Sequence, residues 1–120
     1  MLSKEEKELL LKDLCARLPY GVKMLVNDNV EVLQGINIVD NIVEYSSFLA
    51  SEIEDCKPYL FPLSSMTEEQ EKEYNDLNCY ELGCFPHSEE ALDYLTKNHF
   101  DYRYLIEKGL AIDATGLNIY

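Results

Sequence analysis

The chain is short of positive charge, and this shortage excludes several kinds of partner. Its 120 residues contain 10 Lys and Arg against 23 Asp and Glu, so the formal net charge is −13. Residues 21–66 hold 2 basic and 7 acidic residues, and residues 67–120 hold 4 and 12, so the excess lies beyond the N-terminal segment. Because phosphate backbones and anionic membrane surfaces repel such a chain, we expect neither direct nucleic-acid binding nor membrane binding.

Long apolar runs and a leader-like segment are also lacking. Charged residues occur from the first few positions onward, and no apolar run approaches the roughly 20 residues of a membrane-spanning helix. The four cysteines, Cys15, Cys56, Cys79 and Cys84, do not have the spacing of a disulfide framework. We therefore expect reduced thiols and a cytoplasmic location.

Catalytic and cofactor motifs are missing as well. The chain has no GxGxxG, P-loop, GxSxG or HExxH pattern, so no catalytic or cofactor-binding residue and no cofactor is assigned. Cys79, Cys84 and His87 form the one metal-like cluster, with His99 or Cys56 as a fourth ligand. Structural zinc sites have close cysteine pairs, whereas this cluster has a single loose one. We therefore assign no metal ligand.

Two groups of carboxylates are dense enough to consider for magnesium binding or acid–base chemistry. The sequence shows no glycine-rich phosphate loop and no buried basic partner for either group, so we interpret both as solvated faces. The groups are Glu52, Glu54 and Asp55, and Glu89, Glu90 and Asp93.

The N-terminal residues predict a helix. Ser3 followed by Glu6 is a capping box, and leucines then recur at helical spacing over residues 3–17. The charged residues, Asp13 among them, are assigned to the opposite, polar face. Residues 19–21, Pro-Tyr-Gly, end the helix.

Residues 21–66 predict strands. Short alternating segments at residues 22–26, 30–38, 42–45 and 48–53 are separated by turns rich in Asn and Asp. Gly35, inside the second segment, predicts a bulge or bend. The spacing favours a small bent antiparallel sheet or an SH3-like barrel, which residues 57–63 would close.

Residues 67–120 predict a mainly helical part. Two or three short helices are expected, the last of them ending at Gly109, and then a terminal hairpin or an ordered tail. Their starts are marked by capping residues: Thr67 with Gln70, then Ser88, then Asp101. The fold class is therefore α+β, in a single domain over residues 1–120 with an N-terminal helix (1–20), a β part (21–66) and a mainly helical part (67–120).

Aromatic residues cluster in two places, and they give the candidate interface. Tyr and Arg are favoured at protein interfaces because they bury a large area and carry a polar end. Two interpretations stay open: these side chains attach the C-terminal helices to the sheet, or they contact a partner. The candidate interface residues are Tyr59, Phe61, Tyr102, Arg103 and Tyr104.

Three stretches of the chain are familiar together. They are residues 12–23 (KDLCARLPYGVK), 54–69 (EDCKPYLFPLSSMTEE) and 98–111 (NHFDYRYLIEKGLA). On these stretches the chain resembles a group of short uncharacterised proteins from gut Bacteroides-type bacteria and their prophages, over nearly its whole length. The motifs of that group carry no known chemistry, so the resemblance implies a bacterial or phage cytoplasmic origin and transfers no site residue.

These observations favour a non-enzymatic protein–protein interaction module of bacterial or prophage origin with an acidic surface. Such a surface sets partner choice and association rate more than affinity. Two alternatives belong to other classes: a small metal-dependent or thiol enzyme, and an acidic nucleic-acid mimic that acts on a DNA-binding protein. The sequence does not determine the oligomeric state.

Overall fold

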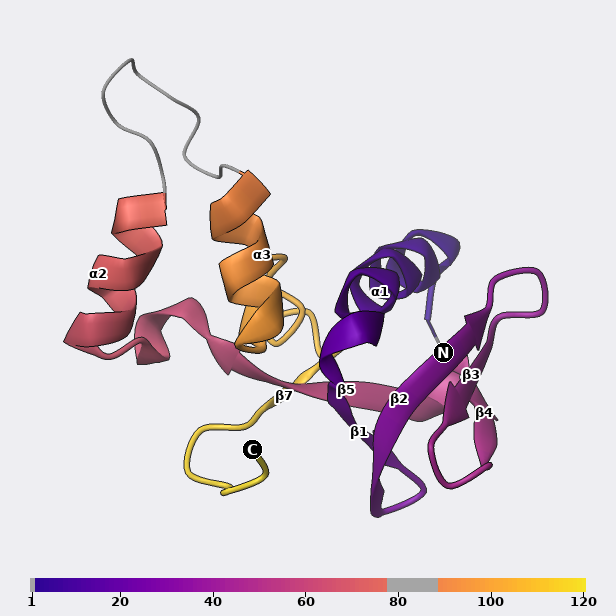
Figure 1. Ribbon diagram of the computed structural model, residues 1–120. Coiled ribbons are helices and arrows are strands. Elements are labelled where there is room, and N and C mark those ends of the chain that lie inside the picture. The colour runs from indigo at the N-terminus through magenta and orange to yellow at the C-terminus, as the bar shows by residue number, and fades with distance from the viewer. Residues whose placement is uncertain (1, 78–88) are drawn as a thin grey trace.

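The computed structural model describes residues 2–77 and 89–120, and it shows an open sheet with one longer and two shorter helices (Figure 1). Within these residues, no helix combines the length and apolar composition needed to cross a membrane. In chain order the elements are α1 (Lys4–Arg17), η1 (Leu18–Tyr20), β1 (Lys23–Val26), β2 (Asn29–Asn37), β3 (Ile42–Tyr45), β4 (Ala50–Glu52), η2 (Ile53–Asp55), β5 (Cys56–Pro62), η3 (Leu63–Ser65), α2 (Glu68–Leu77), α3 (Glu89–Lys97), β6 (Phe100–Asp101) and β7 (Ile112–Asp113).

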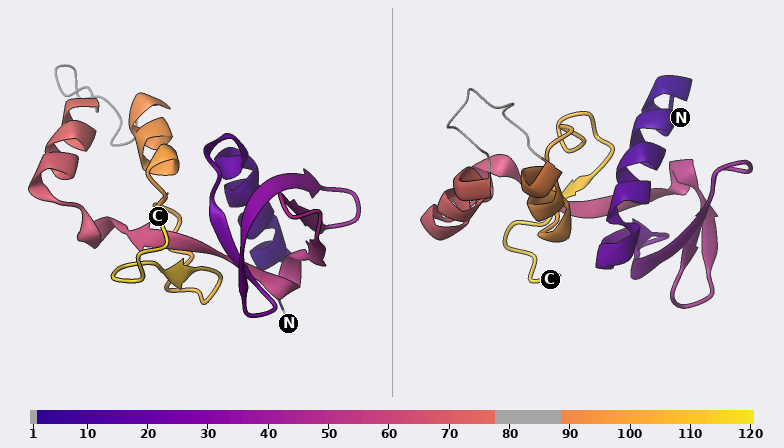
Figure 2. Two further views of the ribbon diagram at one scale, coloured as in Figure 1. Left: turned by 60° about the horizontal axis from the view of Figure 1, so that its bottom comes forward. Right: turned by 45° about the horizontal axis from the view of Figure 1, so that its top comes forward.

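Helix α1 begins and ends close to the predicted positions. Ser3 Oγ accepts a hydrogen bond from Glu6 N (3.1 Å) and Glu6 Oε1 accepts one from Ser3 N (3.0 Å), which confirms the capping box. Past η1 the chain turns at Gly21, whose φ of 63° lies in the left-handed region that glycine enters without steric cost. Leu10 and Leu14 are fully buried, so α1 covers one face of the sheet (Figure 2).

The first strands form an antiparallel meander, as predicted. Asn27 and Asp28 connect β1 to β2 with φ of 48° and 67°, the conformation of a type I′ hairpin turn. The register of β2 against β3 shifts between Leu33 and Gly35, which confirms the predicted bulge. The strand predicted over residues 48–53 is shorter, because only Ala50–Glu52 pair with β3.

The SH3-like barrel is not formed, and the sheet is open. Its strand order is β4-β3-β2-β1-β5-β6, with β7 also paired to β5. The first half of β5 pairs with β1, and its second half pairs in parallel with β6 and β7. Strand β5 therefore leads away from β4 toward the later helices (Figure 1), and a barrel would need it to close against β4.

The C-terminal part has two helices in its described residues, within the two or three that were predicted, and the third helix expected from Asp101 is absent. The capping box before α2 is confirmed, since Gln70 N donates to Thr67 Oγ1 (3.1 Å) and Thr67 N donates to Gln70 Oε1 (3.0 Å). After β6, Asp101 accepts hydrogen bonds from the backbone N of Leu105 and Ile106, but these close a turn. Tyr104 has a φ of 59°, and a left-handed residue cannot continue an α-helix.

The predicted terminal hairpin is also absent from the described residues. Strand β7 pairs in parallel with Tyr59 and Leu60 of β5, and Ala114 N donates to Leu60 O (2.8 Å). The final residues instead form an ordered tail, the other option that the sequence left open. In this tail the Tyr120 hydroxyl donates to Tyr59 O (2.8 Å).

A single buried cluster receives side chains from all three parts of the chain. Residues of α1, of β1 to β3 and β5, and of the segment after β6 lie together in it. Its members are Leu10, Leu14, Val22, Met24, Val26, Leu33, Val43, Tyr45, Ile53, Cys56, Leu60, Leu105, Leu110 and Ala111.

Candidate functional site

The five candidate interface residues lie in different environments. Tyr59 is buried, with 7% of its surface exposed. Phe61 is half-buried, and its ring lies 6.2 Å from that of Phe100 and 5.7 Å from that of Tyr120. Tyr104 is 56% exposed. These three residues do not form one continuous exposed patch, because two of them pack against the chain's own strands and tail.

Tyr102 and Arg103, the other two candidates, belong to a polar network with α1. Arg103 Nη1 donates to Asp13 Oδ1 (2.7 Å) and to the Tyr102 hydroxyl (3.0 Å). The Arg103 guanidinium also lies 4.6 Å from the centre of the Tyr102 ring, a cation–π contact. The Tyr102 hydroxyl and Thr96 Oγ1 are 3.2 Å apart, which ties this segment to α3.

The centre of that network is a buried ion pair within α1. Arg17 donates from Nε to Asp13 Oδ2 (2.7 Å) and from Nη2 to Asp13 Oδ1 (3.2 Å), and both side chains are fully buried. Arg17 Nη2 also donates to the carbonyl of Phe100 (2.7 Å). The assignment of Asp13 to the polar face of the helix was therefore wrong. A fork-shaped guanidinium that bonds a carboxylate and a distant carbonyl orients segments of the chain.

The sequence carries a signal for this buried pair. Asp13 and Arg17 are four residues apart, which places them on one helix face, and they flank Leu14. Two opposite charges beside a buried leucine stripe are compatible with burial when they pair. One carboxylate between two guanidiniums, those of Arg17 and Arg103, leaves one net positive charge in the network.

His99 lies beside this network, against the C-terminal tail. Its ring stacks on Tyr120 with 3.9 Å between centres and 12° between planes. Its φ is 64°, and its Nδ1 is buried without a hydrogen-bond partner. Burial, and then the charges of Arg17 and Lys23, lower the pKa of His99 from 6.5 to about 4. The imidazole is therefore neutral at physiological pH.

The depressed pKa of His99 predicts a pH dependence of stability. In the unfolded chain the imidazole binds a proton near pH 6.5, whereas in the folded chain it does so only near pH 4. The contribution of neutral His99 to the stability of the folded chain is thus fully present above pH 6.5 and is lost as the pH falls toward 4. We expect the melting temperature of the parent to fall more steeply between pH 7 and pH 4.5 than that of H99N, whose Asn tolerates positive φ. Parallel slopes for the two proteins would contradict this effect.

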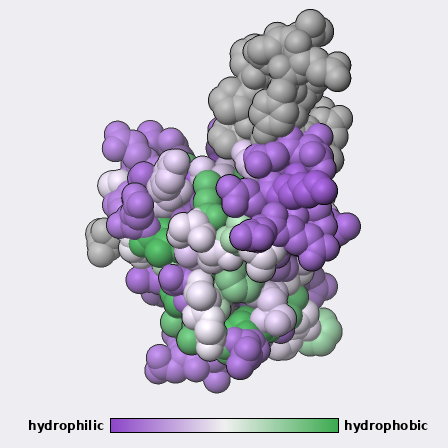
Figure 3. All heavy atoms as spheres, turned by 90° about the vertical axis from the view of Figure 1, so that its left-hand side faces the viewer, coloured by the Kyte–Doolittle hydropathy of each residue, from purple (hydrophilic) through white to green (hydrophobic). Residues whose placement is uncertain are grey.

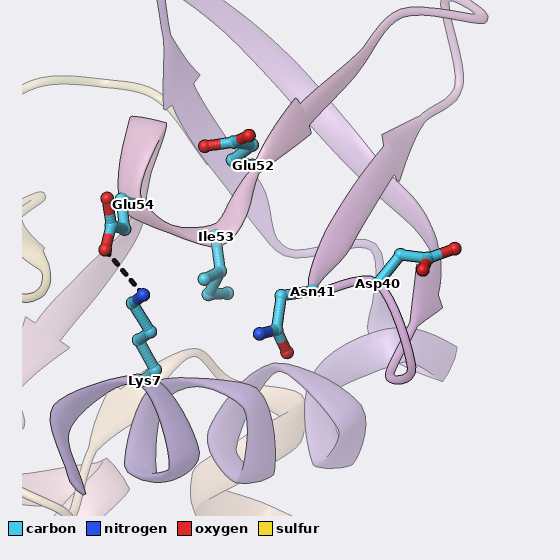
Figure 4. Close-up of a pocket in the computed structure, with 6 residues that line it drawn as sticks. All are labelled: Lys7, Asp40, Asn41, Glu52, Ile53 and Glu54. Atoms are coloured by element: carbon cyan, nitrogen blue, oxygen red, sulfur yellow. Dashed lines mark ion pairs between the residues drawn. The ribbon is translucent and has the colours of Figure 1, made fainter. Parts of the chain in front are cut away.

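The carboxylates of residues 52–55 line or flank a hollow between α1 and η2, but they do not converge. Lys7 Nζ pairs with Glu54 Oε1 at 2.7 Å across the hollow. Glu52 and Asp40 also line it, yet Figure 4 shows both side chains directed away from the Lys7–Glu54 pair. Asp55 is exposed outside this lining. The arrangement therefore gives no support to metal or acid–base chemistry at this group.

Cys56, one of the two described cysteines, is not placed for nucleophilic chemistry. Cys56 is buried, its Sγ lies 3.6 Å from the carbonyl of Ile53, and burial raises the pKa of its thiol. A protonated, buried thiol is a poor nucleophile. Cys15 is half-buried, and both cysteines are free thiols.

The metal-like cluster falls outside the described residues, since Cys79, Cys84 and His87 all lie between residues 78 and 88. The side chains of Glu89 and Glu90 are likewise outside what the structure describes. Within residues 2–77 and 89–120, no three His, Cys, Asp or Glu side chains come together as a group that would hold a metal ion.

The face that carries α2 presents many carboxylates. Glu68, Glu69 and Glu71 fall in the first turn of α2, where they favour the positive end of the helix dipole. The Tyr94 hydroxyl on α3 donates to Glu73 Oε2 of α2 (3.0 Å). Hydrophilic side chains dominate the outer parts of this face, with paler and apolar ones toward its middle (Figure 3). This pattern is typical of a solvated helix surface.

The turn between β3 and β4 carries Phe48, a residue that the sequence analysis placed in a strand. Tyr45 N donates to Leu49 O (3.0 Å) and Phe48 N donates to Tyr45 O (3.0 Å), which closes a loop of Ser46, Ser47 and Phe48. Three-residue hairpin loops end with a left-handed residue that is usually glycine. Phe48 occupies this position with a φ of 70°, and 95% of its surface is exposed.

The fold of the chain does not account for Phe48. A residue with a Cβ loses about 1–2 kcal/mol in the left-handed region, and an exposed phenyl ring gains no free energy from burial. Leu49 next to it is 54% exposed, so two large apolar side chains stand together at this tip. Strained backbone positions cluster at active sites, ligand clamps and switch regions. The predicted strand over residues 48–53 includes Phe48, whereas the structure places Phe48 in the turn before β4.

Comparisons with known proteins assign no family to the chain. No protein-family model, no curated protein and no solved structure matches the chain.

Proposed function

We propose that the chain is a non-enzymatic interaction module that binds another protein through the tip of the β3–β4 hairpin. The observation that carries the proposal is Phe48, a fully exposed aromatic side chain at a backbone position that favours glycine. A partner that buries the ring supplies the free energy that this chain alone does not recover. Leu49, exposed beside it, extends the apolar contact.

The acidic surroundings of the tip support a partner with a basic surface. Residues 24–56 contain seven Asp and Glu and no Lys or Arg. Complementary charge raises the association rate and selects the partner, and its effect weakens as salt screens it. The free thiols of Cys15 and Cys56 fit the reducing cytoplasm of the bacterial or prophage origin proposed for this module.

Replacing Phe48 gives opposite effects on folding and on binding. In F48G and F48N the left-handed position is occupied by a residue that tolerates it, so we expect the free energy of unfolding to rise by about 1 kcal/mol and the melting temperature by roughly 4 °C. Thermal and urea unfolding measure this gain. A fall in stability would show that the ring packs on the chain itself.

The binding experiment uses the same variants in a pull-down from lysate of the source cells. The parent is expected to capture a partner at low salt and to lose it at high salt, and F48N is expected not to capture it. V39N is the matched control, because Val39 is 90% exposed at the other end of β3, in the β2–β3 turn. Equal capture by the parent and F48N would overturn the proposed function.

A further inference from the structure

Strand β4 has a free edge directly beside the hairpin tip. It is the last strand in the sheet order, and within the described residues no strand pairs with its outer side. Tyr45 N donates to Leu49 O and Ile53 N donates to Asn41 O, both at 3.0 Å, so residues 49 and 53 face β3. Because antiparallel strands alternate, the N–H and C=O groups of residues 50 and 52 point away from the sheet.

A hollow connects this edge to the exposed aromatic ring. It has a volume of about 270 Å³ and lies against the start of β4. It is lined by Gln34, Glu44, Tyr45, Phe48, Leu49 and Ala50. A strand added to β4 would thus place one of its side chains in this hollow, against Phe48, while its backbone bonds to the edge.

The charges beside the edge select the occupant. Glu44 is exposed on β3 and Glu52 is exposed on β4. The segment from residue 24 to residue 56 has no cation, and Lys7 of α1, which lines a hollow together with Glu52, pairs with Glu54. A second copy of the chain, paired edge to edge, would bring the carboxylates of Glu44 and Glu52 close to those of the other copy, and like charges near one another destabilise a strand pair. Lys and Arg side chains would pair with the same carboxylates, and a cation can also stack on the exposed Phe48 ring.

We infer that β4 accepts an added β-strand from a partner protein, and that this strand is an extended basic segment with alternating cationic and apolar residues. The inference rests on the proposed function and adds to it the binding mode and the chemistry of the partner. Glu44 lies opposite Ala50, and Glu52 is two residues further along β4, so both carboxylates share the face on which Glu44 and Ala50 line the hollow. The backbone bonds supply the affinity, the cationic side chains of the strand pair with Glu44 and Glu52 on this face, and the apolar stem of one of them fills the hollow against Phe48.

The direct test follows amide hydrogen exchange with a synthetic eight-residue peptide of alternating Lys and Val. In the free protein, the amides of Ala50 and Glu52 are expected to exchange rapidly and those of Ser51 and Ile53 slowly. Peptide binding is expected to slow the exchange of Ala50 and Glu52. A peptide of alternating Glu and Val is the control and is expected to bind at least about tenfold more weakly at low salt. Absence of binding by the Lys peptide, or binding without protection of the two amides, overturns the inference.

Two substitutions test separately how much backbone pairing and charge contribute to peptide binding. A50P removes an outward N–H and leaves the bonds to β3 in place, as proline does on edge strands, and is expected to weaken peptide binding by at least about tenfold. E52K is expected to weaken it by roughly fivefold. E69K on α2 changes the net charge equally, at the other end of the molecule (Figure 1), and is expected to leave binding unchanged. Thermal melts are the control that checks whether all three variants fold.

The pull-down with A50P distinguishes this inference from the proposed function. If F48N loses the partner and a folded A50P retains it, the interaction module stands and strand addition is wrong. If F48N retains the partner, the proposed function itself fails. Loss of the partner by both variants, with retention by E69K, supports both.

Discussion

Replacing Arg17 with methionine is expected to lower the free energy of unfolding by about 3–5 kcal/mol. The side chain is fully buried, and it bonds both Asp13 and the carbonyl of Phe100. In R17M the Phe100 carbonyl loses its charged donor, and buried Asp13 keeps only Arg103 as a cationic partner. Leaving a buried charge and a buried acceptor incompletely paired costs more than the loss of one exposed ion pair. Urea unfolding followed by circular dichroism measures the change.

The same helix offers a matched control. K7M removes the cation of the Lys7–Glu54 pair, whose side chains are 32% and 24% exposed. Partly exposed pairs contribute roughly 0–1 kcal/mol, so K7M is expected to change stability by no more than that. R17K keeps the charge but loses the planar fork, and we expect it to fall between the parent and R17M. If R17M were as stable as K7M, the network of Asp13, Arg17 and Arg103 would not be responsible for holding α1 against the segment after α3.

Replacing Leu60 with alanine is expected to cost about 2–5 kcal/mol and to unfold the whole chain in one transition. Leu60 is fully buried on β5, and it belongs to a cluster that also contains Leu14 of α1 and Leu110 near the C-terminus. Removing the branched end of Leu60 leaves a cavity lined by residues of the β part and of the mainly helical part. Because residues of the β part and of the mainly helical part share this cluster, we expect the two parts to unfold together.

Differential scanning calorimetry measures that cooperativity directly. L60A is expected to melt in a single transition at lower temperature, and F61A to show a smaller decrease because its ring is only half-buried. L117A, at a position that is 50% exposed, is expected to change stability by less than about 0.5 kcal/mol. Two separate transitions in L60A would mean that the two parts fold independently.

Local signals in the sequence predicted the local structure well. Both capping boxes form, Gly35 marks a bulge, and Gly21 ends the first helical segment. Each of these features depends on one to four neighbouring residues, whose chemistry determines the backbone without distant contacts. The barrel was wrong because it depended on where β5 pairs, and that pairing is decided by contacts with β6 and β7 far along the chain.

Burial and function were harder to predict than local structure. Asp13 was placed on the polar face because charge was taken as exposure, whereas two arginines compensate its burial. Four of the five predicted interface residues make contacts within the chain. Tyr59 and Phe61 contact the C-terminal tail, and Tyr102 and Arg103 contact α3 and α1, so these residues serve at least in part to attach segments. The tip that we propose as the contact surface depends on the sign of one φ angle, that of Phe48, which a propensity for strands does not reveal.

The most direct test of the account is the amount of partner protein captured at low salt by F48N relative to the parent. F48N, although at least as stable as the parent, is expected to capture almost none. Undiminished capture by F48N would contradict it, because the exposed ring would then have no part in binding.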